Sequence, residues 1–542
     1  MVWKEIKKIW RKESVNITSA AFLIGGASLF SRFIGFIRDR LLTSAFGAGL
    51  QLDSYYVAFK VPDLIFQLIV LGAISSGFIP VFTEVWEKKS KTQAQNLVKT
   101  LLILILLILF VVAVLVALFA VPLTRLIAPG FYGLQLDRTV VLMRWLLISM
   151  FILGFSSIMG GVLQARRKFV GFALAPIVYN LGIIFGILFL APYFGIKGVV
   201  WGVILGSLLH LSIQAYIALP IIFEKYTFSF QITSDVKKII HLTIPRLFGL
   251  AGAQINLIVL IALASSLPTG SVTVFNLANN LQFVPIGLIG VSFAVASFAS
   301  FSKMVANNDL NLLKKEFLML VRKITFFILP IMAIMLLLRV QIVRILFGGR
   351  RFDWMATVQT ADILAIFVLS LLVQSLIPVI TRVFYALQDT YTPVLISILV
   401  VVLNIVLAIY FKNFWGVLGL AGSLSIAAFV QFGLLWWFLR RRLGGHLDTK
   451  KMFMANLKVL IASLALFGFG WLAKQVVGFV YPLRTFWQVL LQTFLSLLLG
   501  GLMFVFLSYL LKIEEFFIFV NLFKYKIFKK VKLSEGIEEI VR

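Results

Sequence analysis

The sequence predicts an all-α, polytopic membrane protein. Of its 542 residues, 61% are hydrophobic and only 13% are charged, which is more apolar surface than a soluble fold of this length can bury. Residues 101–121 form an unbroken apolar run, and about 20 such residues cross the hydrocarbon core as a helix. Because lipid offers backbone groups no hydrogen-bond partner, we expect helices and no open sheet.

The hydrophobic segments predict about 14 transmembrane helices. An even number of spans puts both ends of the chain on the same side of the membrane. The expected spans are 17–46, 52–84, 97–123, 137–164, 170–193, 197–223, 237–266, 270–302, 318–346, 356–387, 391–411, 416–439, 453–477 and 485–511.

Basic clusters predict which side that is. They fall in both terminal segments and in five of the six loops that follow an even-numbered span, and cytoplasmic loops carry the excess of Lys and Arg. We therefore expect both termini in the cytoplasm, as an amphipathic segment over residues 1–16 and a basic amphipathic tail over 513–542. These loops and tails account for the net charge of +29, so we expect membrane lipids as partners and no nucleic acid. The basic loops are 88–91, 166–168, 237–238, 314–315 and 440–442.

An internal repeat divides the chain. Gly195 and Gly198 recur as Gly416 and Gly419, each 221 positions later. A shift of six helices preserves direction, so the sequence predicts two parallel six-helix lobes over 17–223 and 224–445. Two additional helices follow in residues 446–512. Paired lobes of this kind are typical of transporters that bind their substrate between them.

The first span carries charges that an apolar helix does not need. It contains Ser31, Arg32, Arg38 and Asp39, and an arginine at the bilayer centre costs about 2.5–3.5 kcal/mol on insertion scales. Such residues face a polar cavity and contact something anionic. We expect Arg38 and Asp39 to point in different directions. The alternative for Arg32 is an ion pair with an aspartate of the second span, either Asp53 or Asp63.

Three further polar residues are candidates for the same cavity. Asp53 fits a helix cap or salt bridge as well as an ion ligand. Lys60 either lines the cavity or extends to the membrane interface. Asn280 occupies the position of Lys60 in the second repeat, and either hydrogen-bonds a ligand or joins helices.

Enzymatic chemistry is not predicted. The chain has no cysteine and no nucleotide-binding motif, and His210, His241 and His446 are scattered, which favours packing or loop roles over metal ligation. We expect no cofactor and no metal, and the sequence specifies no coupling ion.

Several motifs together resemble one family. SRFIGFIRDRLLTSAFGAGLQLDSYYVAFKVPDL (31–64), GVLQARRKFVGFALAPIVYNLG (161–182) and VFYALQDTYTPV (383–394) resemble the MurJ (MviN) lipid II flippases of the multidrug, oligosaccharidyl-lipid and polysaccharide exporter superfamily. The resemblance covers residues 17–440 or so.

That resemblance implies two lobes around a cationic central cavity, with two further helices forming a groove for a polyprenyl chain. It implies a monomer in the bacterial inner membrane that moves undecaprenyl-pyrophosphate-linked muropeptide from the inner to the outer leaflet by alternating access. The positions that match polar residues lining the family's cavity are Arg32, Arg38, Asp39, Asp53 and Lys60.

The sequence departs from the family where charges are usual. Phe66, Gln67 and Leu71 replace an arginine pair and a glutamate, and Asn279 and Asn280 replace an Asp-Arg pair. These changes keep open a flippase for another polyprenyl-pyrophosphate-linked oligosaccharide. A cation-coupled multidrug antiporter fits less well, because the first span is cationic. A membrane scaffold for cell-wall enzymes would need no cavity charges.

Overall fold

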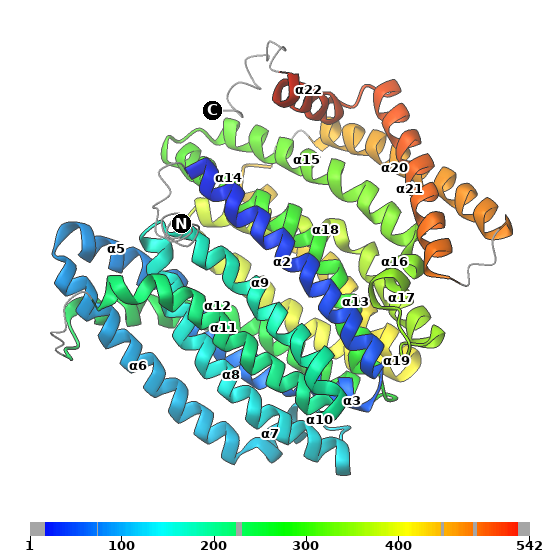
Figure 1. The fold of residues 1–542 in the computed structure, drawn as a ribbon. Coiled ribbons are helices and arrows are strands. Elements are labelled where there is room, and N and C mark those ends of the chain that lie inside the picture. The colour runs from blue at the N-terminus through cyan, green and yellow to red at the C-terminus, as the bar shows by residue number, and fades with distance from the viewer. Residues whose placement is uncertain (1–16, 73, 224–229, 446–448, 481–484, 529–542) are drawn as a thin grey trace. The chain divides into compact units, whose positions relative to one another are not determined.

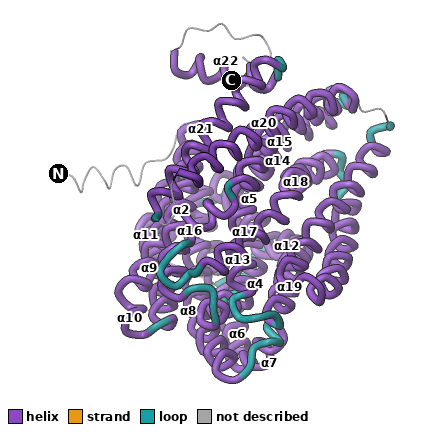
Figure 2. Tube along the Cα trace, turned by 90° about the vertical axis from the view of Figure 1, so that its right-hand side faces the viewer, coloured by secondary structure: helices purple, strands orange, loops and turns teal. Residues whose placement is uncertain are grey.

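The computed structural model describes residues 17–528, apart from 73, 224–229, 446–448 and 481–484. The expected amphipathic segment 1–16, the last part of the expected tail and His446 lie outside these residues. Helices joined by short turns make up the described chain, and no strand occurs in it (Figure 2). The all-α prediction is therefore confirmed.

Contacts divide the chain into two compact units. Unit 1 comprises residues 1–274 with 346–356, and unit 2 comprises 275–345 with 357–542. The helices of unit 1 are α2 (Ile17–Phe46), α3 (Leu50–Ala58), α4 (Lys60–Ile65), the π-helices η1 (Phe66–Leu71) and η2 (Ile74–Phe78), α5 (Ile79–Lys88), α6 (Lys91–Leu118), α7 (Ala120–Ile127), α8 (Gly133–Ala165), α9 (Phe169–Phe185), the π-helix η3 (Gly186–Leu190), α10 (Ala191–Phe194), α11 (Ile196–Ile222) and α12 (Ser234–Ser265).

The boundary between the units falls inside α13 (Ser271–Pro285). The helices of unit 2 that follow are the π-helix η4 (Ile286–Val291), α14 (Ser292–Ala306), α15 (Leu310–Leu337), α16 (Arg339–Phe347), α17 (Trp354–Leu369), α18 (Leu371–Ala386), α19 (Tyr391–Arg442), α20 (Thr449–Val480), α21 (Phe486–Leu510) and α22 (Glu514–Phe528). The last residues of α16 belong to unit 1. The lobe limits expected from the sequence repeat stay a prediction.

The membrane-spanning character of the chain is clear from its helices. Within the described residues, nine helices are long and apolar enough to cross a membrane, or up to ten when α17 and α18, bent by 46° at their junction, count as one span. The chain is therefore a multi-pass membrane protein. The number 14 stays a prediction, because the second expected span is broken into α3, α4, η1, η2 and α5.

Local backbone geometry repeats between the two halves. Gly195 and Gly416, 221 positions apart, both have positive φ, at 59° and 55°, a conformation that glycine adopts without steric cost. Arg167 and Gln388, also 221 apart, end their helices at φ 53° and 60°. The π-helix η4 begins at residue 286, which is 220 positions after η1 begins at residue 66. The repeat read from the sequence thus extends to helix ends and helix irregularities.

Small residues let α9 and α11 pack at close range (Figure 1). A Cβ on Gly182 of α9 would lie 2.3 Å from the Cα of Gly206, and one on Gly186, the first residue of η3, would lie 2.5 Å from the Cα of Gly202. Gly198, Gly202 and Gly206 recur every fourth residue, so they share one face of α11. Close backbone approach of this kind replaces hydrophobic driving force where the solvent is itself apolar.

A buried carboxylate closes the turn before α13. Asp53 on α3 is 2% exposed. Its carboxylate accepts hydrogen bonds from the backbone N–H groups of Gly270 at 2.7 Å and Thr273 at 2.8 Å, and from the hydroxyl of Thr273. The first N–H groups of a helix lack partners inside it. Asp53 supplies those partners from another helix, which is the helix-cap alternative raised by the sequence.

Replacing Gly202 by Ala should destabilise the protein by about 1–3 kcal/mol, the usual cost of overpacking a tight contact. The added Cβ would lie 2.6 Å from the Cα of Gly186. Gly422→Ala is the matched control, because a Cβ there meets no atom within 4 Å. Thermal unfolding of both variants in detergent measures the difference. Equal midpoints would contradict the close-packing account.

Replacing Asp53 by Asn should lower stability by about 1–3 kcal/mol, since one acceptor oxygen is lost at a buried site. Asp309→Asn is the control. Asp309 caps α15 by accepting from the N–H of Leu312 at 2.9 Å, and Asn caps an exposed helix as well as Asp does. Thermal unfolding should separate the two variants, and similar midpoints would argue against the role given to Asp53.

Candidate substrate-binding site

Arg38 lies at the centre of a polar cluster between α2 and α9. Its Nε and Nη2 donate to Oδ1 of Asp39 at 2.9 and 2.7 Å, and its Nη1 donates to Oδ1 of Asn180 at 2.8 Å. Asn180 donates in turn to Oγ of Ser31 at 3.3 Å and to the carbonyl oxygen of Pro176 at 3.1 Å. The amide of Asn180 therefore ties the guanidinium on α2 to the backbone of α9.

The expectation that Arg38 and Asp39 point in different directions is wrong. Neighbouring helical residues diverge by about 100°, but the arginine side chain is long enough to fold back onto the carboxylate. Asp39 is nearly enclosed, with 7% of its side chain exposed against 25% for Arg38. An enclosed carboxylate needs a counter-charge, and Arg38 supplies it.

The pairing with Asp39 and Asn180 leaves Arg38 with unused hydrogen-bond donors. A guanidinium has five N–H donors, and the three bonds above use three of them. The remaining two N–H groups are on the part-exposed side chain. Asp39 and Asn180 hold the planar guanidinium group of Arg38 in one orientation. The two remaining N–H donors are therefore pre-oriented for a phosphate or carboxylate.

Arg32 has a different environment from Arg38. It is exposed, and it forms no ion pair with any described residue. The alternative pairing with Asp53 or Asp63 is not formed, because Asp53 binds the turn before α13. Arg32 is thus an exposed cation that no described carboxylate pairs with, six positions before Arg38 along α2.

Lys60 opens α4 and is half-buried. Asp63 follows one helical turn later, and the two side chains attract each other electrostatically. Asp63 is exposed to the cavity described below. The short helix α4 therefore presents a cation and an anion together rather than an isolated lysine.

Asn280 lies on α13 in unit 2 with its side chain exposed. The neighbouring Asn279 is 6% exposed and accepts from Nε2 of Gln282 at 2.9 Å. Gln374 donates to Gln282 at 3.2 Å and to Ser370 at 2.8 Å. The buried amides of unit 2 thus join helices to one another, whereas Asn280 stays accessible.

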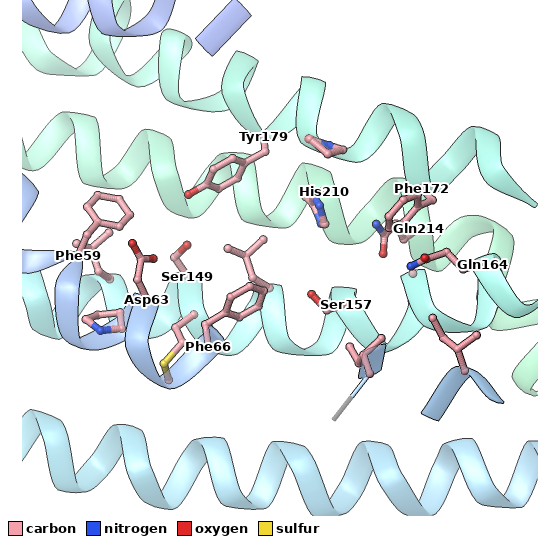
Figure 3. A pocket seen from close by; sticks show the side chains of 18 residues that line it. Phe59, Asp63, Phe66, Ser149, Ser157, Gln164, Phe172, Tyr179, His210 and Gln214 are labelled. Carbon is pink, nitrogen blue, oxygen red and sulfur yellow. The ribbon is translucent and has the colours of Figure 1, made fainter. Parts of the chain in front are cut away.

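Unit 1 contains a cavity of about 460 Å³ between α4, η1, α8, α9 and α11. In Figure 3 the hydroxyl of Tyr179 and the carboxylate of Asp63 point into the same space, with Ser149 beside them and His210 and Gln214 farther along. Aromatic side chains cover the remaining wall; these include Phe59, Phe66 and Phe172. None of the seven residues predicted from the sequence lines this cavity.

The spacing of polar residues along α8 and α11 is a sequence signal for this cavity that the charged residues of the first span do not give. Ser149, Ser157 and Gln164 on α8 are spaced by eight and seven residues, so they share one face of the helix. His210 and Gln214 on α11 are four apart. The sequence favours a packing or loop role for His210; its Nδ1 does contact Oγ of Ser156 at 2.7 Å, yet its ring also lines the cavity. Polar residues that recur with helical periodicity in an apolar helix mark a polar face of that helix.

Comparison with known proteins gives a consistent result. A family model described as "Lipid II flippase MurJ" matches residues 42–491. A relative from Buchnera aphidicola subsp. Acyrthosiphon pisum, named "Probable lipid II flippase MurJ", is 26% identical over 509 residues, covering 92% of this chain and 98% of its own. The "Lipid II flippase MurJ" of Burkholderia cenocepacia is 27% identical over 441 residues, covering 79% and 84%.

Solved structures agree on the fold. One described as "Lipid II flippase MurJ, inward closed conformation" superposes with a TM-score of 0.74 at 24% identity, covering 90% of this chain and 99% of that one. An inward-facing multidrug resistance MATE family transporter of the MOP superfamily gives 0.65 at 16% identity, covering 76% and 94%.

The family match runs from α2, which carries the Arg38 cluster, to α21 near the end of the helical chain. It includes every polar residue described above except Ser31, Arg32, Arg38 and Asp39, which lie in the part of α2 before residue 42. This chain belongs to the MurJ family of lipid II flippases.

Proposed function

We propose that this protein flips lipid II, moving undecaprenyl-pyrophosphate-linked muropeptide from the inner to the outer leaflet by alternating access. Membership of the family over residues 42–491 supports the assignment. The observation that carries it at the level of chemistry is Arg38, whose guanidinium is fixed by Asp39 and Asn180 with two donors left over.

The headgroup of such a substrate needs cations that are held in place. A pyrophosphate is matched by the planar fork of arginine, which makes paired, charge-assisted hydrogen bonds. Arg38 is the fixed member of the pair and Arg32 the exposed one. About 9 Å separate the two residues along the helix axis, so we propose that they contact different parts of the headgroup. Lys60 and Asn280 are further candidates for contact with its polar groups.

The polyprenyl tail needs an apolar surface that stays open to lipid. Between α20 and α21 lies a groove of about 500 Å³, lined by apolar side chains alone. Residues from both helices contribute, among them Leu472 and Val476 from α20 and Leu499 and Phe506 from α21. We propose that this groove holds the tail, so that only the headgroup has to leave the lipid phase.

We propose the bacterial inner membrane as the location, with both termini in the cytoplasm, because the basic loops alternate along the chain. The working form would be a monomer in contact with membrane lipids, with no nucleic-acid partner. Transport by this route breaks and forms no covalent bond, so no enzymatic role and no cofactor enter the proposal.

One observation favours a second candidate, a flippase for another polyprenyl-pyrophosphate-linked oligosaccharide. Gln67, at a position where the family usually has arginine, hydrogen-bonds Gln254 of α12. Phe66 lines the cavity of unit 1. A neutral amide pair and an aromatic ring suit a sugar surface better than a phosphate, so the glycan bound here can differ from the muropeptide.

Replacing Arg38 by Ala should lower the initial rate of lipid II flipping about 10- to 100-fold, since a hydrogen bond to a charged group contributes about 1.5–3 kcal/mol. Arg38→Lys should recover part of the rate, because lysine keeps the charge but not the fork. The measurement is flipping of fluorescent lipid II in proteoliposomes, together with rescue of a strain depleted of its own lipid II flippase.

Arg144→Ala is the control for Arg38→Ala. Arg144 is exposed on α8, and its Nε donates to the carbonyl oxygen of Ala117 at 3.0 Å. It should flip lipid II at the wild-type rate. Full activity of Arg38→Ala would contradict the role of Arg38. Failure of the wild-type chain to rescue, despite correct insertion, would favour the second candidate.

Replacing Val476 by Trp should fill the groove and weaken flipping of full-length lipid II several-fold, while a short-chain analogue is flipped at the normal rate. Leu464→Trp is the matched control. Both residues lie on α20 and are similarly exposed, at 63% and 62%, but Leu464 does not line the groove. Equal loss for long and short tails would argue against tail binding at this site.

A further inference from the structure

A second pocket lies in unit 2, separate from the groove between α20 and α21. It has a volume of about 450 Å³ and is formed where α15, the start of α20, the end of α21 and the start of α22 meet. Figure 1 shows α22 next to α15 and α20 in this region. The basic residues of the pocket are Arg322, Lys450, Lys451, Lys458 and Lys512.

Arg322 is paired with carboxylates of the same pocket. Arg322 binds Glu514 through Nη2 at 2.6 Å and Glu515 through Nε at 2.7 Å. These two glutamates are the acidic residues of the pocket lining. Among the described residues, Lys450, Lys458 and Lys512 form no ion pair. The pocket thus holds five cationic and two anionic side chains, an excess of three positive charges.

The two glutamates are held unequally. The side chain of Glu515 is 7% exposed and that of Glu514 is 73% exposed. Glu515 therefore anchors the start of α22 to α15, whereas Glu514 occupies the open side of the same guanidinium. An incoming anion can replace Glu514 on Arg322 without disturbing the buried pair.

An apolar layer lies next to these charges. Phe326, Val459, Ala462 and Ile513 form a buried cluster joining α15, α20 and the start of α22. Ile513 also lines the pocket, together with Met454 and Ala455. A cationic rim beside apolar side chains is the arrangement that suits a phospholipid, with its phosphate at the rim and its chains against the helices.

The backbone at Lys512 adds an independent observation. This residue has φ 50°, and it ends α21 with Lys512 N–H donating to Tyr509 and Ile513 N–H donating to Ser508. Glycine is the usual residue at such a helix end, and asparagine the next. A lysine occupies this position despite its steric cost, and its ammonium lines the pocket without an ion pair to any described residue.

We propose that this pocket binds a phosphate group, carried by the headgroup of an anionic phospholipid on the side of the membrane where α20 starts and α21 ends. Lys450, Lys458 and Lys512 would contact the phosphate, and Arg322 would join them as Glu514 is displaced. The same chemistry would accept a soluble phosphate. The apolar wall at Met454, Ala455 and Ile513 favours the lipid.

The test measures binding of fluorescent phosphatidylglycerol to the purified full-length chain in neutral detergent, without lipid II. The variant K450Q/K458Q/K512N removes the three charges, and Asn at 512 suits the helix end better than Lys does. Its affinity should fall at least about tenfold, since each basic residue near a membrane surface contributes appreciably to anionic lipid binding. K450R/K458R/K512R should retain binding.

The matched control is K303Q/K314Q/K315Q, which removes three lysines from α14 and α15 outside the pocket. It should bind phosphatidylglycerol like the wild type. Undiminished binding by K450Q/K458Q/K512N, with an unchanged thermal midpoint, would overturn the proposal, and so would an equal loss in the control. Inorganic phosphate is added as competitor in a second arm. Displacement at millimolar phosphate would assign the site to soluble phosphate, whereas displacement by unlabelled phosphatidylglycerol alone would assign it to the lipid.

Discussion

An arginine inside a membrane helix must have its charge compensated, and the Arg38 cluster shows how this chain does so. Asp39 balances the charge, and Asn180 from α9 fixes the orientation of the guanidinium. The cluster therefore joins two helices and also presents N–H donors outward. A fully neutralised and enclosed pair would have been structural only. Because 25% of the Arg38 side chain remains exposed, the contacts that stabilise the helix pair leave part of the guanidinium accessible, as the proposed anion site requires.

The polar residues of unit 1 fall into groups with separate roles. The carboxylate of Asp53 accepts hydrogen bonds from Gly270 and Thr273 in the turn before α13, so Asp53 stabilises the fold and does not line the candidate site. Asp63 and Tyr179 face the cavity instead. The contrast has a simple origin: a carboxylate that accepts three hydrogen bonds has little capacity left, whereas one that meets only a lysine of its own helix remains available. Burial and hydrogen-bond count separate the two aspartates, although both lie in the same broken span.

The C-terminal helices combine two surfaces with different chemistry. The groove between α20 and α21 is apolar throughout, while the pocket at the opposite end of these helices, beside α22, is strongly basic. A lipid substrate needs the first, and an anionic membrane surface matches the second. The buried cluster of Phe326, Val459, Ala462 and Ile513 holds α20 and α22 against α15, so both surfaces depend on the same packing.

The sequence by itself determined the helical class, the membrane environment and the 221-residue repeat, because apolar run length and glycine position are local properties. The ends of α8 at Ala165 and α18 at Ala386 follow the repeat directly. Only the tertiary structure decided which polar residues meet. It paired Arg38 with Asp39, gave Asp53 to a turn more than 200 positions away, and assembled a cavity from Asp63, Tyr179 and His210. Such contacts depend on how helices pack against each other. The periodicity of one helix shows which of its faces is buried but does not specify the distant segment that packs there.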